Sequence, residues 1–213
     1  MRHRLLLFDL DGTLLDHFAA IHRCHAYAMR QIGLPEPTPE QVRHAVGGGL
    51  DVAIARLAGP ENVPAILPHF TKLWNATNLD DVTVLPGVLE LLRAQVGAGG
   101  RSAVLTNKRG PSAREVCAHL GLTPLLSAIT GACDTPWLKP APELTRQMLG
   151  QLGVTAAEAC YIGDSPYDVE TARQAGLAFY GVTTGTHDAA QLRAAGAENV
   201  YPSLAGVQAA LFA

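Results

Sequence analysis

Short apolar segments alternate with helical patterns along most of this chain, and this alternation constrains the fold more than any other feature. Residues 5–8 form a continuous apolar run that stops at an acidic turn, as a fully buried parallel strand does. Similar runs recur at 102–105, 127–130, 160–162 and 178–182. Helical patterns lie between them, over 86–96, 112–120, 142–152 and 166–175. This order predicts a doubly wound parallel α/β sheet with helices on both faces.

One long stretch interrupts the alternation. Residues 17–81 carry helical patterns and no strand-like run, and Thr38, Pro39 and Gln41 form a helix start with a capping box. We therefore predict a small all-helical cap domain at 17–81, inserted after the first strand. The α/β core domain would then consist of residues 1–16 and 82–213.

The charge balance argues against nucleic acid as a partner. Sixteen Lys and Arg residues face 19 Asp and Glu residues, which gives a net charge of -3, so no basic surplus exists to neutralise a phosphate backbone. The first apolar run ends at Asp9 and is too short for a signal sequence or a membrane span. The four cysteines include no Cys-x-x-Cys pair. We expect a cytoplasmic monomer or homodimer with reduced thiols and no membrane partner.

The acidic turn DLDGTL at 9–14 follows the first predicted strand, at the end of the sheet where open α/β folds bind ligands. Asp9 and Asp11 are two residues apart, and carboxylates this close repel each other unless a cation lies beside them. A hard divalent cation such as magnesium would relieve the repulsion. One carboxylate could also attack as a nucleophile while its neighbour moves protons. The alternative is an Asp-Gly turn with solvated acids.

Three further segments place polar residues where a predicted strand ends or a helix begins. AVLTNK at 103–108 supplies Thr106 and Asn107, and a hydroxyl with nearby backbone N–H groups can hold phosphoryl oxygens. Lys139 precedes a proline before a helix, and it is one of three lysines, with Lys72 and Lys108. A lysine is a compact charge suited to a phosphoryl group.

The last of these segments is YIGDSPYD at 161–168, which places Asp164 directly after a predicted strand. Asp168 permits two interpretations. Ser165, Pro166 and Asp168 form an acceptable helix start with an acid at the third position. Alternatively, Asp168 takes part in a metal site, through water or through Lys139.

In this order, the four segments resemble the motifs of the haloacid dehalogenase-like (HAD) phosphatases over nearly the whole chain. The resemblance implies that Asp9 is a nucleophile that becomes phosphorylated and that Asp11 is the general acid and base. It also implies that Thr106 and Lys139 hold the phosphoryl group. By the same resemblance, Mg²⁺ would bind Asp9, the backbone carbonyl of Asp11, and Asp164. The true dehalogenases lack an acid at the position of Asp11, so the intact set implies phosphoryl chemistry.

The predicted cap points to a small phosphate ester as the substrate. AVGGGLDVAIARL at 45–57, together with TNK at 106–108, resembles the phosphoglycolate phosphatases, which makes 2-phosphoglycolate the leading candidate. Gly48 lies among three consecutive glycines that could let backbone approach a ligand, although a flexible link is the alternative. The cap shows no obvious aromatic pair to stack a nucleobase, and we expect Trp74 to be a packing residue.

Basic side chains in the cap receive no site assignment. His22 and His25 share a helical face and, with Cys24, could hold a transition metal, but a polar or cleft-facing helix face is the simpler interpretation. His17 stands where the family often has serine, a departure that could alter substrate contacts. Arg43 could meet a substrate carboxylate, and a solvated helix arginine is again simpler.

Two other functions stay open at this stage. A phosphosugar mutase with the same core would pass the phosphoryl group between sugar hydroxyls. A noncatalytic HAD-like regulator would bind a ligand without turnover, but it would have no need for both Asp9 and Asp11.

Overall fold

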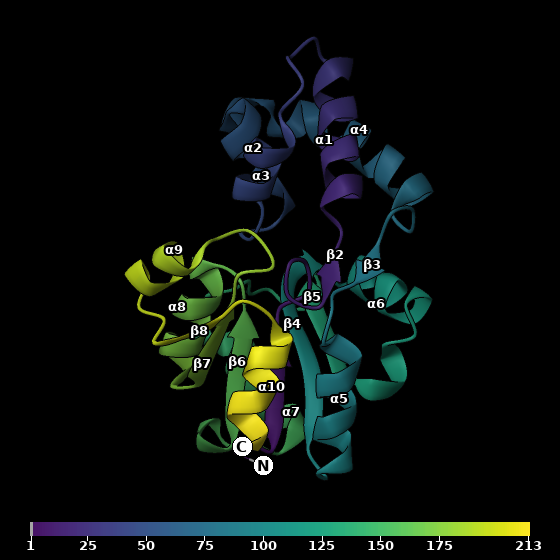
Figure 1. The fold of residues 1–213 in the computed structure, drawn as a ribbon. Helices are drawn as coiled ribbons and strands as arrows, with labels where there is room; N and C mark the ends of the chain where they lie inside the picture. The colour runs from purple at the N-terminus through teal and green to yellow at the C-terminus, as the bar shows by residue number, and fades with distance from the viewer. Residues whose placement is uncertain (1) are drawn as a thin grey trace.

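A six-stranded parallel sheet forms the core of the structure, a computed structural model that describes residues 2–213 (Figure 1). The strand order is β5-β4-β1-β6-β7-β8, so β1 lies in the middle of the sheet. The strands are β1 Leu5–Phe8, β4 Arg101–Arg109, β5 Ala128–Ala132, β6 Ala159–Gly163, β7 Ala178–Val182 and β8 Asn199–Tyr201. All four residues of β1 are buried, which explains its unbroken apolar sequence. The predicted parallel α/β fold is confirmed.

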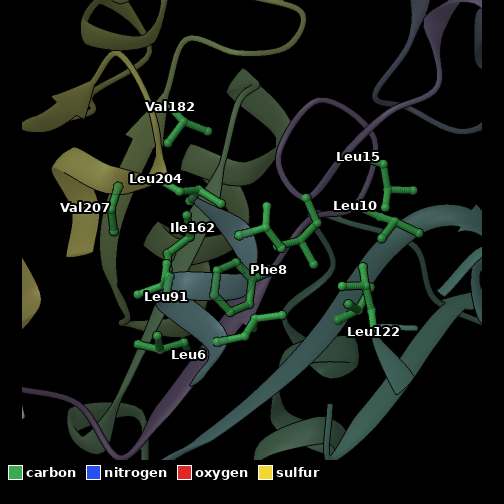
Figure 2. Close-up of a cluster of buried hydrophobic side chains, with 14 of the residues drawn as sticks. Leu6, Phe8, Leu10, Leu15, Leu91, Leu122, Ile162, Val182, Leu204 and Val207 are labelled. Carbon is green, nitrogen blue, oxygen red and sulfur yellow. The ribbon is translucent and has the colours of Figure 1, made fainter. Parts of the chain in front are cut away.

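Helices cover both faces of this sheet. One face carries α5 Val88–Gly97, α6 Gly110–His119 and α10 Leu204–Phe212, and the other carries α7 Pro142–Leu152 and α8 Pro166–Ala175. Figure 2 shows the interface between the sheet and the helices of the first face. Leu6 and Phe8 of β1 pack there with Leu91 of α5 and with Leu204 and Val207 of α10. The short helix α9 Ala189–Ala194 packs beside α8. Single-turn 3₁₀ helices occur at Thr123–Leu125 and Ala156–Glu158.

Four helices form a separate lobe above the carboxyl ends of the strands (Figure 1). They are α1 Phe18–Gln31, α2 Pro39–Ala45, α3 Leu50–Ala58 and α4 Val63–Thr77, with a 3₁₀ turn at Pro60–Asn62. Their apolar faces enclose a second hydrophobic core that includes Ile21, Ile54 and Ile66. The expected capping box at Thr38 is present at the start of α2. No helix within residues 2–213 is both long and apolar enough to cross a membrane.

Two short antiparallel strands, β2 Leu15–Asp16 and β3 Thr83–Val84, join this lobe to the sheet. The chain therefore leaves the sheet after β1 and returns to it through one narrow connection (Figure 1). This topology supports the proposed division into a cap at 17–81 and a core at 1–16 and 82–213.

The structure differs from the sequence-based prediction at several element ends. Strand β4 continues to Arg109 instead of ending at 105, because β5 still pairs with it at Ala132 after a register shift. Thr106 and Asn107 consequently lie within β4 and not after it. Helix α5 begins at Val88 because Gly87, at φ 85°, precedes it in a left-handed conformation. The prediction also missed α9, β8 and α10, whose short segments carry weak patterns.

Candidate active site

The order of the strands places the four sequence segments around one point. Because β4 and β6 flank β1, Asp9 and Asp164, which follow β1 and β6, lie close to Thr106 in the second half of β4. Gly12 is needed in the turn after β1, because its φ is +84° and a Cβ there would lie 2.8 Å from an Asp164 carboxylate oxygen. The acidic turn and the end of β6 are therefore packed directly against each other.

Three buried carboxylates gather at this point. Asp9, Asp164 and Asp168 each offer an oxygen within 4.8 Å of the other two. Burial, reinforced by the charge of Asp168, raises the pKa of Asp9 to about 6, although Lys139 opposes the shift. Burial and the charges of Asp168 and Asp9 raise the pKa of Asp164 to about 7. The repulsion therefore arises among Asp9, Asp164 and Asp168, and not between Asp9 and Asp11 as the sequence of the acidic turn predicts. A divalent cation would remove it.

Hydrogen bonds and an ion pair hold the carboxylates of Asp9 and Asp164 in place. Oδ1 of Asp9 is buried and pairs with Nζ of Lys139, which lies 2.9 Å from it. Asp164 is held in place, because Thr13 Oγ1 donates to its Oδ1 at 2.9 Å and the Thr186 backbone N–H to its Oδ2 at 2.7 Å. The clustered carboxylate oxygens are hard donors, which fit Mg²⁺.

Asp168 combines the two roles that the sequence left open. It completes a capping box with Ser165 at the start of α8, and its Oδ2 accepts hydrogen bonds from the Ser165 backbone N–H at 3.0 Å and the Asp164 N–H at 3.1 Å. Its other oxygen, Oδ1, accepts a 2.7 Å bond from Nζ of Lys139. Asp168 thus fixes the lysine as well as the helix.

Lys139 is almost completely buried between Asp9 and Asp168. Burial alone would lower its pKa, but the charges of Asp168 and Asp9 outweigh burial and raise it well above the ordinary value. Asn107 holds the backbone of this lysine, because its Oδ1 accepts from the Lys139 N–H at 2.8 Å and its Nδ2 donates to the Lys139 carbonyl at 3.2 Å. Lys139 is therefore a permanently charged group at a fixed position beside Asp9.

Asp11 lies in a separate cluster with Lys108 and His17. Nζ of Lys108 lies 2.9 and 3.0 Å from the two carboxylate oxygens of Asp11, and Nδ1 of His17 lies 3.5 Å from Oδ1. Burial would raise the pKa of Asp11, but Lys108 and His17 outweigh burial and hold it well below its usual range. His17 is fully buried, and its Nε2 lies 2.6 Å from the carbonyl of Asn78.

The sequence did not assign a role to Lys108 or His17. The scarcity of lysine and the position of Lys108 directly after Thr106 and Asn107 were the available signals. The contact itself joins residues 97 positions apart, so spacing could not reveal it.

A cavity of about 560 Å³ opens from Asp9 and Thr106 into the helical lobe. Its lining includes Asp9, Asp11, Ile21, His25, Gly47, Gly49, Leu50, Ala53, Phe70, Thr71, Trp74, Asn75, Asn78, Thr106, Asn107, Lys108, Arg109 and Glu115. The cavity therefore joins the carboxylates to residues of α1, α3 and α4, where a substrate's leaving group would extend.

Gly48 and Arg43, two cap residues considered for substrate contact, lie outside the cavity lining among residues 2–213. Gly48 is not part of the cavity lining within residues 2–213, and a Cβ on it would lie 2.7 Å from the Tyr167 hydroxyl. Arg43 donates to the Gly185 carbonyl at 3.1 Å and covers the Phe18 ring. These residues connect the cap to the core, while their neighbours Gly47 and Gly49 face the cavity.

The two cap histidines have different surroundings. Nε2 of His22 lies 2.9 Å from the Pro37 carbonyl, whereas His25 is buried and lines the cavity. Cys24 packs in the hydrophobic core of the cap. Among the described residues, the metal-ligating side chains that lie close together in a group of three are Asp9, Asp164 and Asp168. The structure therefore gives no support to a transition-metal site in the cap.

The expectation that the cap has no aromatic pair is wrong. Phe70 and Trp74, one turn apart on α4, stack with their ring centroids 5.6 Å apart and an interplanar angle of 13°. Both rings also line the cavity, so Trp74 packs in the cap and faces the substrate side.

Comparison with known proteins identifies the class that this fold and site define. The family model described as "Haloacid dehalogenase-like hydrolase" matches residues 6–182. The chain belongs to the haloacid dehalogenase-like hydrolases. The structure resembles that of a haloacid dehalogenase-like family hydrolase from Streptococcus pneumoniae, with a TM-score of 0.89, 22% identity and 98% of each chain covered.

Relatives narrow the class to phosphatases. "Probable phosphatase IndB" of Dickeya dadantii is 34% identical over 90% of this chain and 86% of its own length. A 5'-nucleotidase of Pseudomonas aeruginosa is 32% identical, with 91% and 89% covered. A phosphoglycolate phosphatase of Rhodobacter capsulatus is 33% identical, with 84% of each covered. The protein is a phosphoric monoester hydrolase, so a noncatalytic regulator is not supported.

Proposed function

We propose that this protein hydrolyses a small phosphomonoester in a magnesium-dependent reaction through an aspartyl-phosphate at Asp9. The observation that carries the proposal is the arrangement around Asp9, a buried carboxylate that lies beside the fixed ammonium of Lys139 and within a cluster of three aspartates. A carboxylate nucleophile splits the hydrolysis into two easier steps. Lys139 and Thr106 would hold the phosphoryl oxygens.

Asp9, Asp164 and the backbone carbonyl of Asp11 would hold Mg²⁺. When bound, the cation neutralises charge on the phosphoryl group and on the crowded carboxylates. Asp168 would keep these ligands in position, because it accepts hydrogen bonds from Nζ of Lys139 and from the backbone N–H of Asp164.

In the first step an oxygen of Asp9 forms a bond to phosphorus while the bond to the leaving oxygen breaks. Asp11 donates a proton to that oxygen. A phosphate in the site would compete with Asp11 for Lys108, which loosens the hold of Lys108 on Asp11 and lets Asp11 carry this proton. In the second step the carboxylate of Asp11 accepts a proton from water, which attacks phosphorus and releases phosphate from Asp9.

The finer assignment of 2-phosphoglycolate as the substrate stays a prediction. The segment at 45–57 supports it, and so does the resemblance to the phosphoglycolate phosphatase of Rhodobacter capsulatus. The 5'-nucleotidase relative supports a larger leaving group. The proposed chemistry at Asp9 is the same in both cases, because the leaving group lies on the cavity side.

A trapping experiment tests the proposal. The purified protein is incubated with p-nitrophenyl phosphate and Mg²⁺, phosphate release is measured, and a quenched sample is reduced with borohydride. An aspartyl-phosphate would be reduced to homoserine, which peptide mass spectrometry should locate at position 9. Release of phosphate with no modification at Asp9 would refute the covalent step. Transfer of the phosphoryl group to a sugar hydroxyl, without release, would support the mutase alternative.

A further inference from the structure

Aromatic rings form one wall of the cavity above Asp9. The His25 and Phe70 ring centroids lie 4.7 Å apart, and Phe70 stacks on Trp74 at 5.6 Å. All three side chains line the cavity, and Ile21 and Ala53 add apolar surface to it. Flat rings bind favourably against such surfaces, because stacking adds to the gain from burying apolar area.

The cap side of this cavity carries no net charge. In the described part of the chain, the lysine and arginine that line the cavity are Lys108 and Arg109, and both come from β4 of the core. Nζ of Lys108 pairs with Asp11 and lies 4.5 Å over the Trp74 ring, at the end of the cavity nearest the core, and Arg109 is exposed. Burial lowers the pKa of His25 to about 4, so its imidazole is neutral at neutral pH. A substrate carboxylate placed against Ile21, His25 and Ala53 of the cap would lose its hydration without gaining a cation from those residues.

Polar groups among the rings favour a ligand with hydrogen-bonding edges. Nδ1 of His25 is buried and has no hydrogen-bond partner among residues 2–213. Thr71 and Asn75 of α4 also line the cavity. A buried imidazole nitrogen without a partner costs free energy, which a ligand could recover by supplying a donor or an acceptor.

The volume of the cavity is large enough for a leaving group with more than two carbon atoms. Its volume of about 560 Å³ falls within the range of roughly 300–1,000 Å³ typical of pockets for drug-sized ligands. 2-Phosphoglycolate would place its phosphate at Asp9 and leave most of the aromatic wall uncovered.

We propose that this cavity selects phosphomonoesters whose leaving group carries an uncharged planar ring with polar edges, such as a pyrimidine nucleoside, and that His25 is a specificity-determining residue for that ring. The inference rests on the proposed function, because the phosphate must lie at Asp9. It assigns the aromatic wall of His25, Phe70 and Trp74 to ring binding.

A matched set of esters tests the inference. Uridine 5′-monophosphate and ribose 5-phosphate share the sugar phosphate and differ by the base, and 2-phosphoglycolate represents the small charged ester. We expect kcat/KM for the nucleotide to exceed both others by at least tenfold. A smaller advantage over either ester would overturn the inference, even if all three are hydrolysed.

Variants locate the effect in the cavity. Ala53→Phe fills the space beside the aromatic wall, and His25→Phe keeps a ring while removing its nitrogens. Both should raise KM for uridine 5′-monophosphate at least fivefold and leave ribose 5-phosphate within twofold. Val52→Phe, on the exposed side of the same helix α3, is the matched control and should change neither value. Equal losses for both esters in the first two variants would contradict ring recognition.

A binding measurement separates this inference from the proposed reaction. Calorimetric titration of the wild-type protein with uridine and with ribose needs no turnover, and we expect uridine to bind at least tenfold more tightly. Failure to hydrolyse any ester, including p-nitrophenyl phosphate, would remove the proposed function but not ring binding. Equal affinity for uridine and ribose would remove ring binding whatever the activity.

Discussion

Nζ of Lys108 lies 2.9 Å from Oδ2 of Asp11, and this contact ties the turn after β1 to the end of β4. Both side chains are largely buried, and His17, at the start of the cap, contacts Asp11. The contact keeps Asp11 ionised, so the charge on residue 108 should decide when Asp11 can carry a proton.

The first prediction concerns this lysine. Lys108→Met removes the charge and keeps the length of the side chain, so the pKa of Asp11 should rise and less of its carboxylate should be present at a given pH. We expect the acid limb of the kcat profile to shift to higher pH, with kcat about 10- to 100-fold below that of the wild type at pH values on this limb, which corresponds to about 1.4 to 2.7 kcal/mol.

The measurement is kcat across pH, with Lys72→Met as the control because Lys72 is an exposed lysine of α4. A variant whose profile and kcat both match the wild type would show that Lys108 does not act on Asp11.

The second prediction is that Asp9→Asn abolishes turnover and preserves the fold. Asparagine has nearly the same shape but cannot form the acyl phosphate, and it removes one charge from the crowded carboxylates. We expect activity to fall at least 100-fold, about 2.7 kcal/mol in the activation barrier. Phosphate release and thermal melting should be measured together, with the exposed Asp51→Asn of α3 as the control. Activity above about 10% of wild type would eliminate Asp9 as the nucleophile.

The third prediction concerns the metal. Burial, together with the charges of neighbouring carboxylates, raises the pKa of Asp9 and of Asp164, so Mg²⁺ should stabilise the fold as well as support turnover. After EDTA treatment and dialysis, activity should be lost and Tm should be lower. Mg²⁺ should restore both, while Ca²⁺ should restore Tm but inhibit turnover, because its larger and more variable shell fits in-line transfer poorly. Full activity in the metal-free protein would contradict the prediction.

The fourth prediction follows from His25, whose pKa in the folded state is about 4 against an ordinary value of 6.5. Between these values the unfolded chain binds the proton and the folded chain does not, so stability should fall as pH drops from about 6.5 to 4. The loss attributable to this residue should reach at most about 3 kcal/mol.

Urea unfolding of wild type, His25→Gln and the exposed control His119→Gln at several pH values measures this loss. The His25 variant should show a weaker dependence on pH over that range than the other two proteins. Equal slopes for all three would mean that His25 is not responsible.

Local sequence patterns were sufficient for the sheet and for the order of the motif residues. A strand buried on both faces must be apolar throughout, as at Leu5–Phe8, and glycine after a helix marks its end, as Gly153 does after α7. Parallel pairing of β1 with β4 and β6 then requires Asp9, Thr106 and Asp164 to meet. The patterns of β8 and α9 are too short and too weak to predict these two elements.

The sequence by itself determined the parallel α/β core, the helical character of 17–81 and the residue types that gather beyond the strand ends, because periodicity and turn chemistry act over a few neighbouring residues. The tertiary structure alone decided that Lys108 pairs with Asp11, that Gly48 faces Tyr167, and that Phe70 and Trp74 line a cavity. These contacts depend on how the cap packs over the sheet. Packing joins residues far apart in the chain, and no local pattern specifies such distances.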